Sequence, residues 1–310
     1  MKYEMFDAKA LMGKVVAEEA NIDPSIVVVS TDSAPRTGMT QFIAEHPDRY
    51  YECGIAEGGA IATSAGLATT GKTPVFCAPA PFASGRPYEM FRIDLGYMHQ
   101  NVKVIGRNCG FNYADLGPTH FGIDDLGLIR LIPEVTILAP ADATQLEEGL
   151  RAALHTEGPV YLRVRTAKIP KIFEAGSFEI GKGVTVRDGK DVAIIATGEI
   201  TSNVLEAVDQ LIADGLDPMV ICLPTLYPID KDIIKMAAEK TGKIVTVEEH
   251  FINGGLGSLV CETVAELCPV PVKRLGVPME YVFAGQNPDL IHYCGIDAEG
   301  ITASVKDFVK

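Results

Sequence analysis

One glutamate lies where a carboxylate could exchange a proton with a bound ligand. Glu57 begins a segment made almost wholly of Ala, Gly, Ser and Thr. Because these neighbours offer backbone and methyl groups but no counter-charge, we expect the carboxylate to share a proton with a ligand nitrogen and to form no salt bridge. The structural alternative is a helix-terminal Glu that gains about 0.3–1 kcal/mol from the helix dipole. Gly58 and Gly59 favour the first interpretation, since they let a flat ligand or another backbone approach closely.

An aromatic ring and a histidine lie in loops that follow predicted strands. Phe82 comes after the strand predicted at 75–77, and His120 ends a loop without a hydrophobic pattern at 115–120. Ligand crevices in parallel sheets form at the carboxyl ends of strands, where a ring can stack on a heterocycle. A histidine there can donate a proton or bind a hydroxyl. The structural alternatives are core packing for Phe82 and a solvent-facing loop position for His120.

Two arginines end the strand predicted at 160–164. Arg163 and Arg165 alternate on one face, and a guanidinium at the carboxyl end of a parallel sheet binds phosphate in a bidentate manner. Arg36 is a further candidate for this role. The alternative is a pair of exposed arginines on an edge strand.

Composition excludes several classes of protein. The 310 residues include 41 acidic and 27 basic side chains, for a net charge of −14, which disfavours nucleic acid and anionic membranes as partners. No apolar run is long enough to span a membrane, and residues 1–20 resemble neither a signal nor a transit peptide, so we expect a cytoplasmic protein. Seven cysteines without CxxC spacing or nearby histidine pairs indicate reduced thiols and no metal site.

Helical segments and short β-branched segments alternate throughout the chain, which is typical of α/β proteins with mainly parallel sheets. The predicted helices include those at 5–20, 84–98, 256–267 and 298–309. A turn-rich connector interrupts this pattern near 166–190, and a new strand follows at 191–196. We therefore expect two successive domains of parallel sheets flanked by helices. They span residues 1–167 and 191–310, with a linker at 168–190.

Glu248-Glu249-His250, followed by Gly254-Gly255-Leu256-Gly257-Ser258, resembles a glycine-rich phosphate loop. The segment lacks full GxGxxG spacing and a Walker lysine, so it is a weak nucleotide signal. We expect the glycines to let the following helix pack closely on its strand, with Glu249 and His250 at a domain or subunit edge.

Several motifs, taken in order, resemble the C-terminal half of the transketolase family over roughly residues 5–305. The motifs are Gly-Ile-Ala-Glu at 54–57, Gly-Lys-Thr-Pro at 71–74, Phe-Ala-Ser-Gly-Arg at 82–86, Gly-Pro-Thr-His at 117–120, Pro-Ala-Asp-Ala at 140–143, and Glu-Glu-His with Gly-Gly-Leu-Gly-Ser at 248–258. The resemblance implies a pyrimidine-binding domain followed by the transketolase C-terminal domain.

The resemblance also implies a cofactor, thiamine diphosphate, and a role for each candidate residue. By similarity, Glu57 meets the N1′ nitrogen of the aminopyrimidine and Phe82 contributes the ring beneath it. Asp32 is expected in the cofactor pocket and His120 at the reacting hydroxyls. The anionic end of a sugar phosphate is expected to meet Arg165 and Arg36. Asp115 is a further substrate-binding candidate.

A missing motif implies a partner subunit. Members of the family hold Mg²⁺ (or Ca²⁺) and the diphosphate through Gly-Asp-Gly followed by Asn, and Gly-Asp-Gly is absent from this sequence. The resemblance therefore implies the C-terminal subunit of a split transketolase, in an α2β2 heterotetramer whose other subunit carries the diphosphate-binding domain. Such an enzyme transfers a two-carbon ketol unit from a ketose (phosphate) to an aldose (phosphate).

Departures from the family pattern leave alternatives open. Gly58-Gly59 replaces the Gln-Asn or His-Ala that commonly follows the glutamate, and Asn112–Leu116 replaces Gly-Glu-Asp, which leaves the register of Asp115 open. The alternatives are a 1-deoxyxylulose-5-phosphate synthase-like subunit, a 2-oxoacid dehydrogenase β-like subunit, and a non-catalytic partner.

Overall fold

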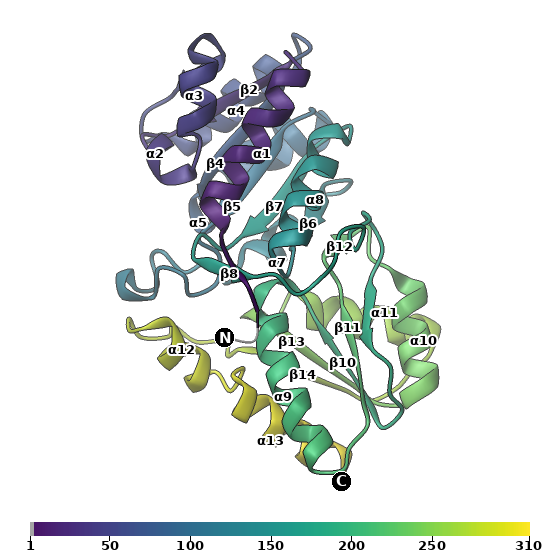
Figure 1. The fold of residues 1–310 in the computed structure, drawn as a ribbon. Helices are drawn as coiled ribbons and strands as arrows, with labels where there is room; N and C mark the ends of the chain where they lie inside the picture. Colours follow the sequence, from purple (N-terminus) through teal and green to yellow (C-terminus); the bar gives the residue numbers. More distant parts are fainter. Residues whose placement is uncertain (1–2) are drawn as a thin grey trace.

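The computed structural model describes residues 3–310, except the side chain of Pro35, and contains two α/β units (Figure 1). The first is built on a seven-stranded sheet of order β12-β6-β7-β5-β4-β2-β3, in which only β12 is antiparallel to its neighbour. Its strands are β2 (Ile26–Ser30), β3 (Tyr50–Glu52), β4 (Thr73–Pro79), β5 (Lys103–Arg107), β6 (Thr136–Leu138), β7 (Val160–Val164) and β12 (Thr225–Tyr227).

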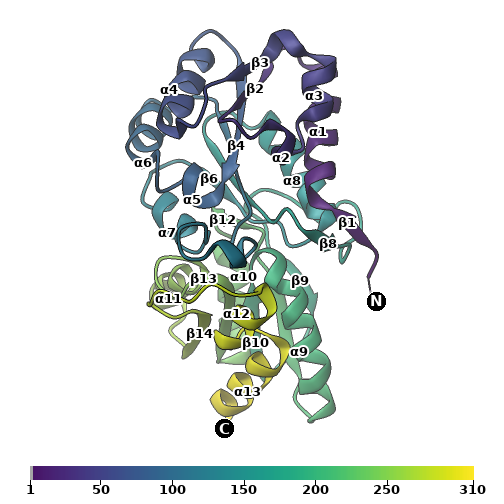
Figure 2. The same cartoon turned by 90° about the vertical axis from the view of Figure 1, so that its left-hand side faces the viewer.

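Helices cover both faces of this sheet (Figure 2). One face packs against α1 (Ala8–Ile22), α3 (Thr40–Glu45) and α8 (Ala143–His155). The other packs against α4 (Glu57–Ala68), the short helices α5 (Ala80–Ala83), α6 (Tyr88–Met90) and α7 (Asp125–Ile129), and the π-helix η2 (Phe91–Tyr97). The central strands are buried along their whole length because both faces are covered.

The second unit has a five-stranded sheet of order β14-β13-β10-β11-β9, in which β9 is antiparallel. Its strands are β9 (Val184–Arg187), β10 (Val192–Ala196), β11 (Pro218–Cys222), β13 (Ile244–Phe251) and β14 (Val272–Val277). The helices of one face are α9 (Thr201–Ala213), α12 (Asn287–Tyr293) and α13 (Ala298–Val309), and those of the other are α10 (Lys231–Thr241) and α11 (Leu256–Leu267).

Strand β12 joins the two units, because it follows β11 in the chain but pairs with β6 of the first sheet. Next to this pairing, Ala139 donates its N–H to the carbonyl of Pro224 at 2.8 Å. Ala139 also accepts the N–H of Gly198 at 3.1 Å. The backbone thus connects the units at points far apart in the sequence.

The predicted fold class is confirmed, and most predicted elements are present. The predicted helix at 5–20 begins later, at Ala8, because the Asp7 carboxylate accepts the Ala10 N–H as an N-cap while Met5–Asp7 pairs as β1 with β8 (Lys168–Pro170). The single helix predicted at 84–98 is wrong. That segment forms α6 and the π-helix η2 instead.

Asp142, in the predicted Pro-Ala-Asp-Ala motif, ties α8 to the segment that leaves the first sheet. It is 1% exposed, and its carboxylate accepts the N–H groups of Gln145 (2.8 Å), Ile172 (2.6 Å) and Phe173 (2.7 Å). Each unpaired buried N–H costs free energy, so the Asp142→Ala variant should unfold about 3 kcal/mol more easily in urea. Asp7→Ala, which removes one exposed cap bond, is the control and should cost about 1 kcal/mol. Equal losses in the two variants would contradict this account.

Candidate active site

The candidate residues gather at the carboxyl edge of the first sheet. Glu57 follows β3, Phe82 follows β4, and His120 lies in the segment after β5. Parallel strands end at one edge, so loops distant in sequence converge there. Arg86 joins Glu57 to Phe82, and the Phe82 ring in turn contacts His120.

Glu57 forms an ion pair that its neighbours in the sequence do not predict. It is the first residue of α4 and is 4% exposed, and its Oε2 accepts a hydrogen bond from Arg86 Nη1 at 2.9 Å. The expectation of a carboxylate without a salt bridge was therefore wrong. The partner lies 29 residues away on the next loop, so the composition around Glu57 gave no sign of it.

Phe82 lies beside the same guanidinium and is half-buried, at the edge of the apolar cluster on this face of the sheet. The Arg86 Cζ lies 3.9 Å from the centroid of the Phe82 ring. Arg86 is thus a planar cation that stacks on an aromatic face and donates to a buried carboxylate. Arg86 belongs to the Phe-Ala-Ser-Gly-Arg motif at 82–86, but the sequence predicted no role for it.

His120 completes the group. Its ring meets the Phe82 ring edge-on, with centroids 5.1 Å apart, and lies 6.0 Å from the ring of Tyr113. Its Nδ1 is hydrogen bonded to Thr119 Oγ1 at 2.9 Å, which leaves Nε2 available for a ligand. Arg107 Nη1 donates to Tyr113 Oη at 2.9 Å and holds that ring in place. Sequence reasoning missed Tyr113 and Arg107, whose roles depend on this loop's conformation.

The group fits the aminopyrimidine part of thiamine diphosphate. Arg86 shows that a flat, nitrogen-bearing group can stack on Phe82 and reach Glu57 at the same time. Its side chain is 46% exposed, so it can give way to a ligand. A Cβ added to Gly59 would meet only Ala56, at 3.8 Å, so the first turn of α4 is open to a neighbour.

Asp32 and Arg36 follow the neighbouring strand β2. Within residues 3–310, neither forms a hydrogen bond, ion pair or ring contact with Glu57, Phe82, Arg86 or His120. Asp32 is exposed, has a left-handed φ of +55°, and donates its N–H to Glu52 Oε1 at 2.7 Å. The same oxygen accepts the Gly54 N–H at 2.8 Å, so Glu52 shapes the turn that leads to Glu57. Arg36 is exposed on the short helix α2 (Ala34–Thr37).

Arg163 of β7 and Arg165, the residue after this strand ends, have different surroundings. Arg163 is 2% exposed and paired with the fully buried Asp125, so it is not a phosphate clamp. Arg165 lines a cavity of about 310 Å³ together with Lys168 and Glu199, and its buried Nε has no partner among residues 3–310. Asp115 is exposed in the 3₁₀ turn η3 (Ala114–Leu116).

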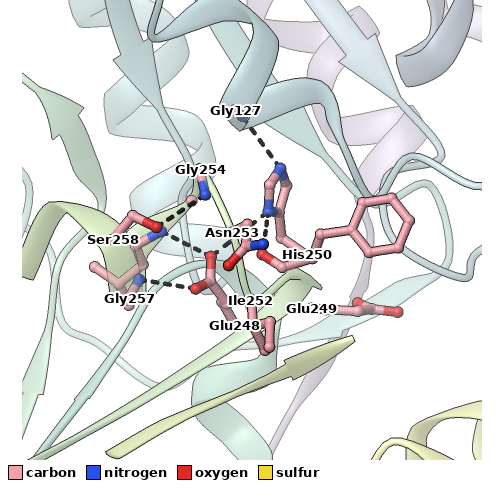
Figure 3. Close-up of polar contacts among 12 residues, drawn as sticks. Gly127, Glu248, Glu249, His250, Ile252, Asn253, Gly254, Gly257 and Ser258 are labelled. Carbon is pink, nitrogen blue, oxygen red and sulfur yellow. Dashed lines mark hydrogen bonds and ion pairs between the residues drawn. The ribbon is translucent and has the colours of Figure 1, made fainter. Parts of the chain in front are cut away.

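The glycine-rich segment after β13 holds a carboxylate of the chain itself (Figure 3). Glu248 accepts the N–H groups of Leu256 (2.7 Å) and Gly257 (2.8 Å) at the start of α11. Burial raises the pKa of Glu248 to about 7. A Cβ on Gly257 would lie 2.9 Å from Arg274 Cγ, so the expected close packing of helix on sheet is present.

All seven cysteines are free thiols. Within residues 3–310, no three His, Cys, Asp or Glu side chains are grouped as metal ligands. No helix in the same range has the length and apolar character of a membrane span.

Comparison with known proteins identifies both units. Residues 4–171 match the family model for the transketolase pyrimidine binding domain, and residues 181–301 match the model for the transketolase C-terminal domain. An apulose-4-phosphate transketolase subunit of Phocaeicola vulgatus is 38% identical over 312 residues, which cover 100% of both chains.

Two further matches differ in how much of the other chain is covered. A solved structure described as a split gene transketolase, inactive beta4 tetramer, superposes with a TM-score of 0.88 at 35% identity and 97% coverage of both chains. The 1-deoxy-D-xylulose-5-phosphate synthase 1 of Geobacter sulfurreducens is 36% identical, but the match covers 96% of this chain and only 47% of that enzyme.

Removal of the Arg86 charge tests the ion pair with Glu57. The Arg86→Gln variant leaves a buried carboxylate without its cation, so its free energy of unfolding should fall by about 1–2 kcal/mol, less than for a fully buried pair because Arg86 is half exposed. Arg92→Gln, which breaks the exposed pair with Glu89, is the matched control and should change stability by less than about 0.5 kcal/mol. Urea unfolding at pH 7 measures both, and equal effects would contradict the assignment.

Proposed function

Because this chain belongs to the transketolase family, as its sequence motifs predicted, we propose that it is the C-terminal subunit of a thiamine-diphosphate-dependent transketolase. In this role it transfers a two-carbon ketol unit from a ketose (phosphate) to an aldose (phosphate) and acts with a partner subunit. Residues 1–167 serve as the pyrimidine-binding domain, residues 191–310 as the C-terminal domain, and residues 168–190 as the linker.

The observation that carries this proposal is a buried carboxylate next to an aromatic face at the carboxyl edge of the sheet. Glu57 holds a proton against the aminopyrimidine nitrogen, and Phe82 supports the ring after the Arg86 side chain moves aside. His120, with Nε2 available, meets the substrate hydroxyls. When bound, thiamine diphosphate supplies the nucleophilic carbon that carries the two-carbon unit between donor and acceptor.

Three features support a partner subunit that holds the diphosphate and its Mg²⁺ or Ca²⁺. Gly-Asp-Gly is absent from the sequence. Next to Glu57, the Ile55 side chain is 75% exposed and Ala56 is also exposed, as expected of a surface that another chain covers. The relative from Phocaeicola vulgatus is itself one subunit of a transketolase. We assign the assembly as α2β2.

The substrate is proposed to be a sugar phosphate. Its anionic end is assigned to Arg165, whose buried Nε has no partner among the described residues, and to Arg36, which is exposed. Asp115, also exposed, is assigned as a further substrate-binding residue. Asp32 is assigned to the rim of the cofactor pocket. Because the chain carries a net charge of −14, local arginines must attract the phosphate.

A donor screen separates transketolase from the synthase alternative. The complex of this chain with a subunit carrying Gly-Asp-Gly…Asn should convert ketose and aldose pairs without gas release. CO₂ release from pyruvate by the same complex would instead identify a decarboxylating enzyme. The split organisation favours the transferase, since this chain matches only about half of the synthase from Geobacter sulfurreducens.

The Glu57→Gln variant tests the catalytic assignment. Gln cannot take up or release the shared proton, so turnover by the complex should fall at least about 10²–10⁴-fold while the fold persists. Glu89→Gln, an exposed carboxylate in the same region, is the control and should leave turnover unchanged. A near-normal rate for Glu57→Gln would refute the assignment, and no turnover by the wild-type complex would refute the proposed function.

A further inference from the structure

The segment that carries His120 is a loop closed at its base by backbone hydrogen bonds. Gly110 donates its N–H to the carbonyl of Gly122 at 2.8 Å, and Gly122 returns the bond at 3.0 Å. We call this pair of residues the neck of the loop. The position of His120 at the candidate active site depends on how the neck is held.

The C-terminal unit holds one side of the neck through Glu249. Its Oε1 accepts the N–H of Phe111, the residue after Gly110, at 2.8 Å. Asn287 Nδ2 donates to the same oxygen at 3.3 Å and to the Phe111 carbonyl at 3.2 Å. Both backbone groups of Phe111 are therefore held by side chains of the other unit. Glu249 is 3% exposed, so these bonds form out of contact with water.

The fit between Glu249 and the neck requires a glycine. A Cβ added to Gly110 would lie 2.2 Å from Glu249 Cδ, and the φ of Gly110 is +59°. Any other residue would displace the carboxylate and would also adopt a strained backbone.

The other side of the neck is held by Arg163. Its Nη2 donates to the carbonyl of Gly122 at 2.9 Å and to the carbonyl of Glu249 at 2.7 Å, while its Nε pairs with Asp125. The backbone of Glu249 is thereby fixed to the first unit. As a result, the Glu249 side chain reaches Phe111 from a fixed backbone position.

The neighbours of Glu249 on β13 make different contacts (Figure 3). Glu248 points to the opposite side of the strand, toward Gly257 and the start of α11. His250 Nε2 accepts the N–H of Gly127 at 3.1 Å, beyond the loop. Among these three side chains, only Glu249 bonds to the segment that carries His120.

We propose that Glu249 is a positioning residue that sets the location of His120 through the neck, and so makes the C-terminal unit part of the active site. This inference rests on the proposed function for its effect on turnover. The contact between Glu249 and the loop can be tested without turnover.

The first experiment uses the isolated chain. In Glu249→Ala, amide exchange at Phe111 should rise about tenfold or more, and the His120 ring signals in the NMR spectrum should shift. Glu249→Gln retains an acceptor oxygen and should give smaller changes. Asn287→Ala, in a half-buried position, is a milder test if Glu249→Ala does not fold. Glu280→Gln, an exposed carboxylate bonded to the last residue of α12, is the control and should change neither. Unaltered Phe111 exchange and His120 ring signals in Glu249→Ala, Glu249→Gln and Asn287→Ala would overturn the inference.

The second experiment is a double-mutant cycle in the reconstituted complex. Glu249→Ala should lower kcat/KM for the ketose donor about tenfold, and Glu249→Gln should restore part of the loss. In a His120→Ala background the same substitution should have almost no further effect, because the loop no longer carries the side chain it positions. Equal losses in both backgrounds would indicate a general structural role and overturn the inference. A wild-type complex without turnover would refute the proposed function while the exchange and NMR results stand.

Discussion

The interaction on which the arrangement depends is the buried ion pair between Arg163 and Asp125. Both side chains are almost fully buried, and Tyr161 Oη donates to the same carboxylate at 2.8 Å. Burial opposes the charge of Arg163, but Asp125 and other nearby acidic groups raise its pKa above the ordinary value. Such a pair adds little net stability compared with apolar packing, yet removal of one partner leaves a costly lone charge. Its value lies in geometry, since one guanidinium binds carbonyls from both units.

The second constraint is the parallel sheet, which gathers the site. Because β3, β4 and β5 run in the same direction, the loops after them end at one edge. There Arg86 contacts Glu57 and Phe82, and Phe82 contacts His120. The loops have no shared secondary structure that would fix them. Side chains that cross between loops and between units do this instead, as Glu52 does for the turn before α4.

The secondary structure of this protein could largely be predicted from short stretches of its sequence. Buried β-branched runs marked the central strands, and α11 and α13 have the predicted limits because amphipathic spacing and flanking turn residues define them. The two-unit α/β fold and the residues at the strand ends followed from the same reasoning. The motif order also identified the family, although no single motif was decisive.

What sequence could not supply were contacts between distant residues. The pairing of Glu57 with Arg86, the use of Arg163 as an internal tie, and the return of β12 to the first sheet all join segments that no local window contains. The irregular segment at 88–97 was missed for another reason. Its apolar spacing also fits a regular helix. The π-helix depends on contacts with distant residues: Gly96 packs so closely on Ile132 that an added Cβ would lie 2.3 Å from the Ile132 Cγ2 atom.

The strand β12 limits how this polypeptide can be divided in evolution. A break in the gene between the two units would leave the β6 edge of the first sheet open, with unpaired backbone groups and a surface prone to aggregation. The pairing of β12 with β6 therefore makes the first sheet depend on a segment that follows β11 of the second unit.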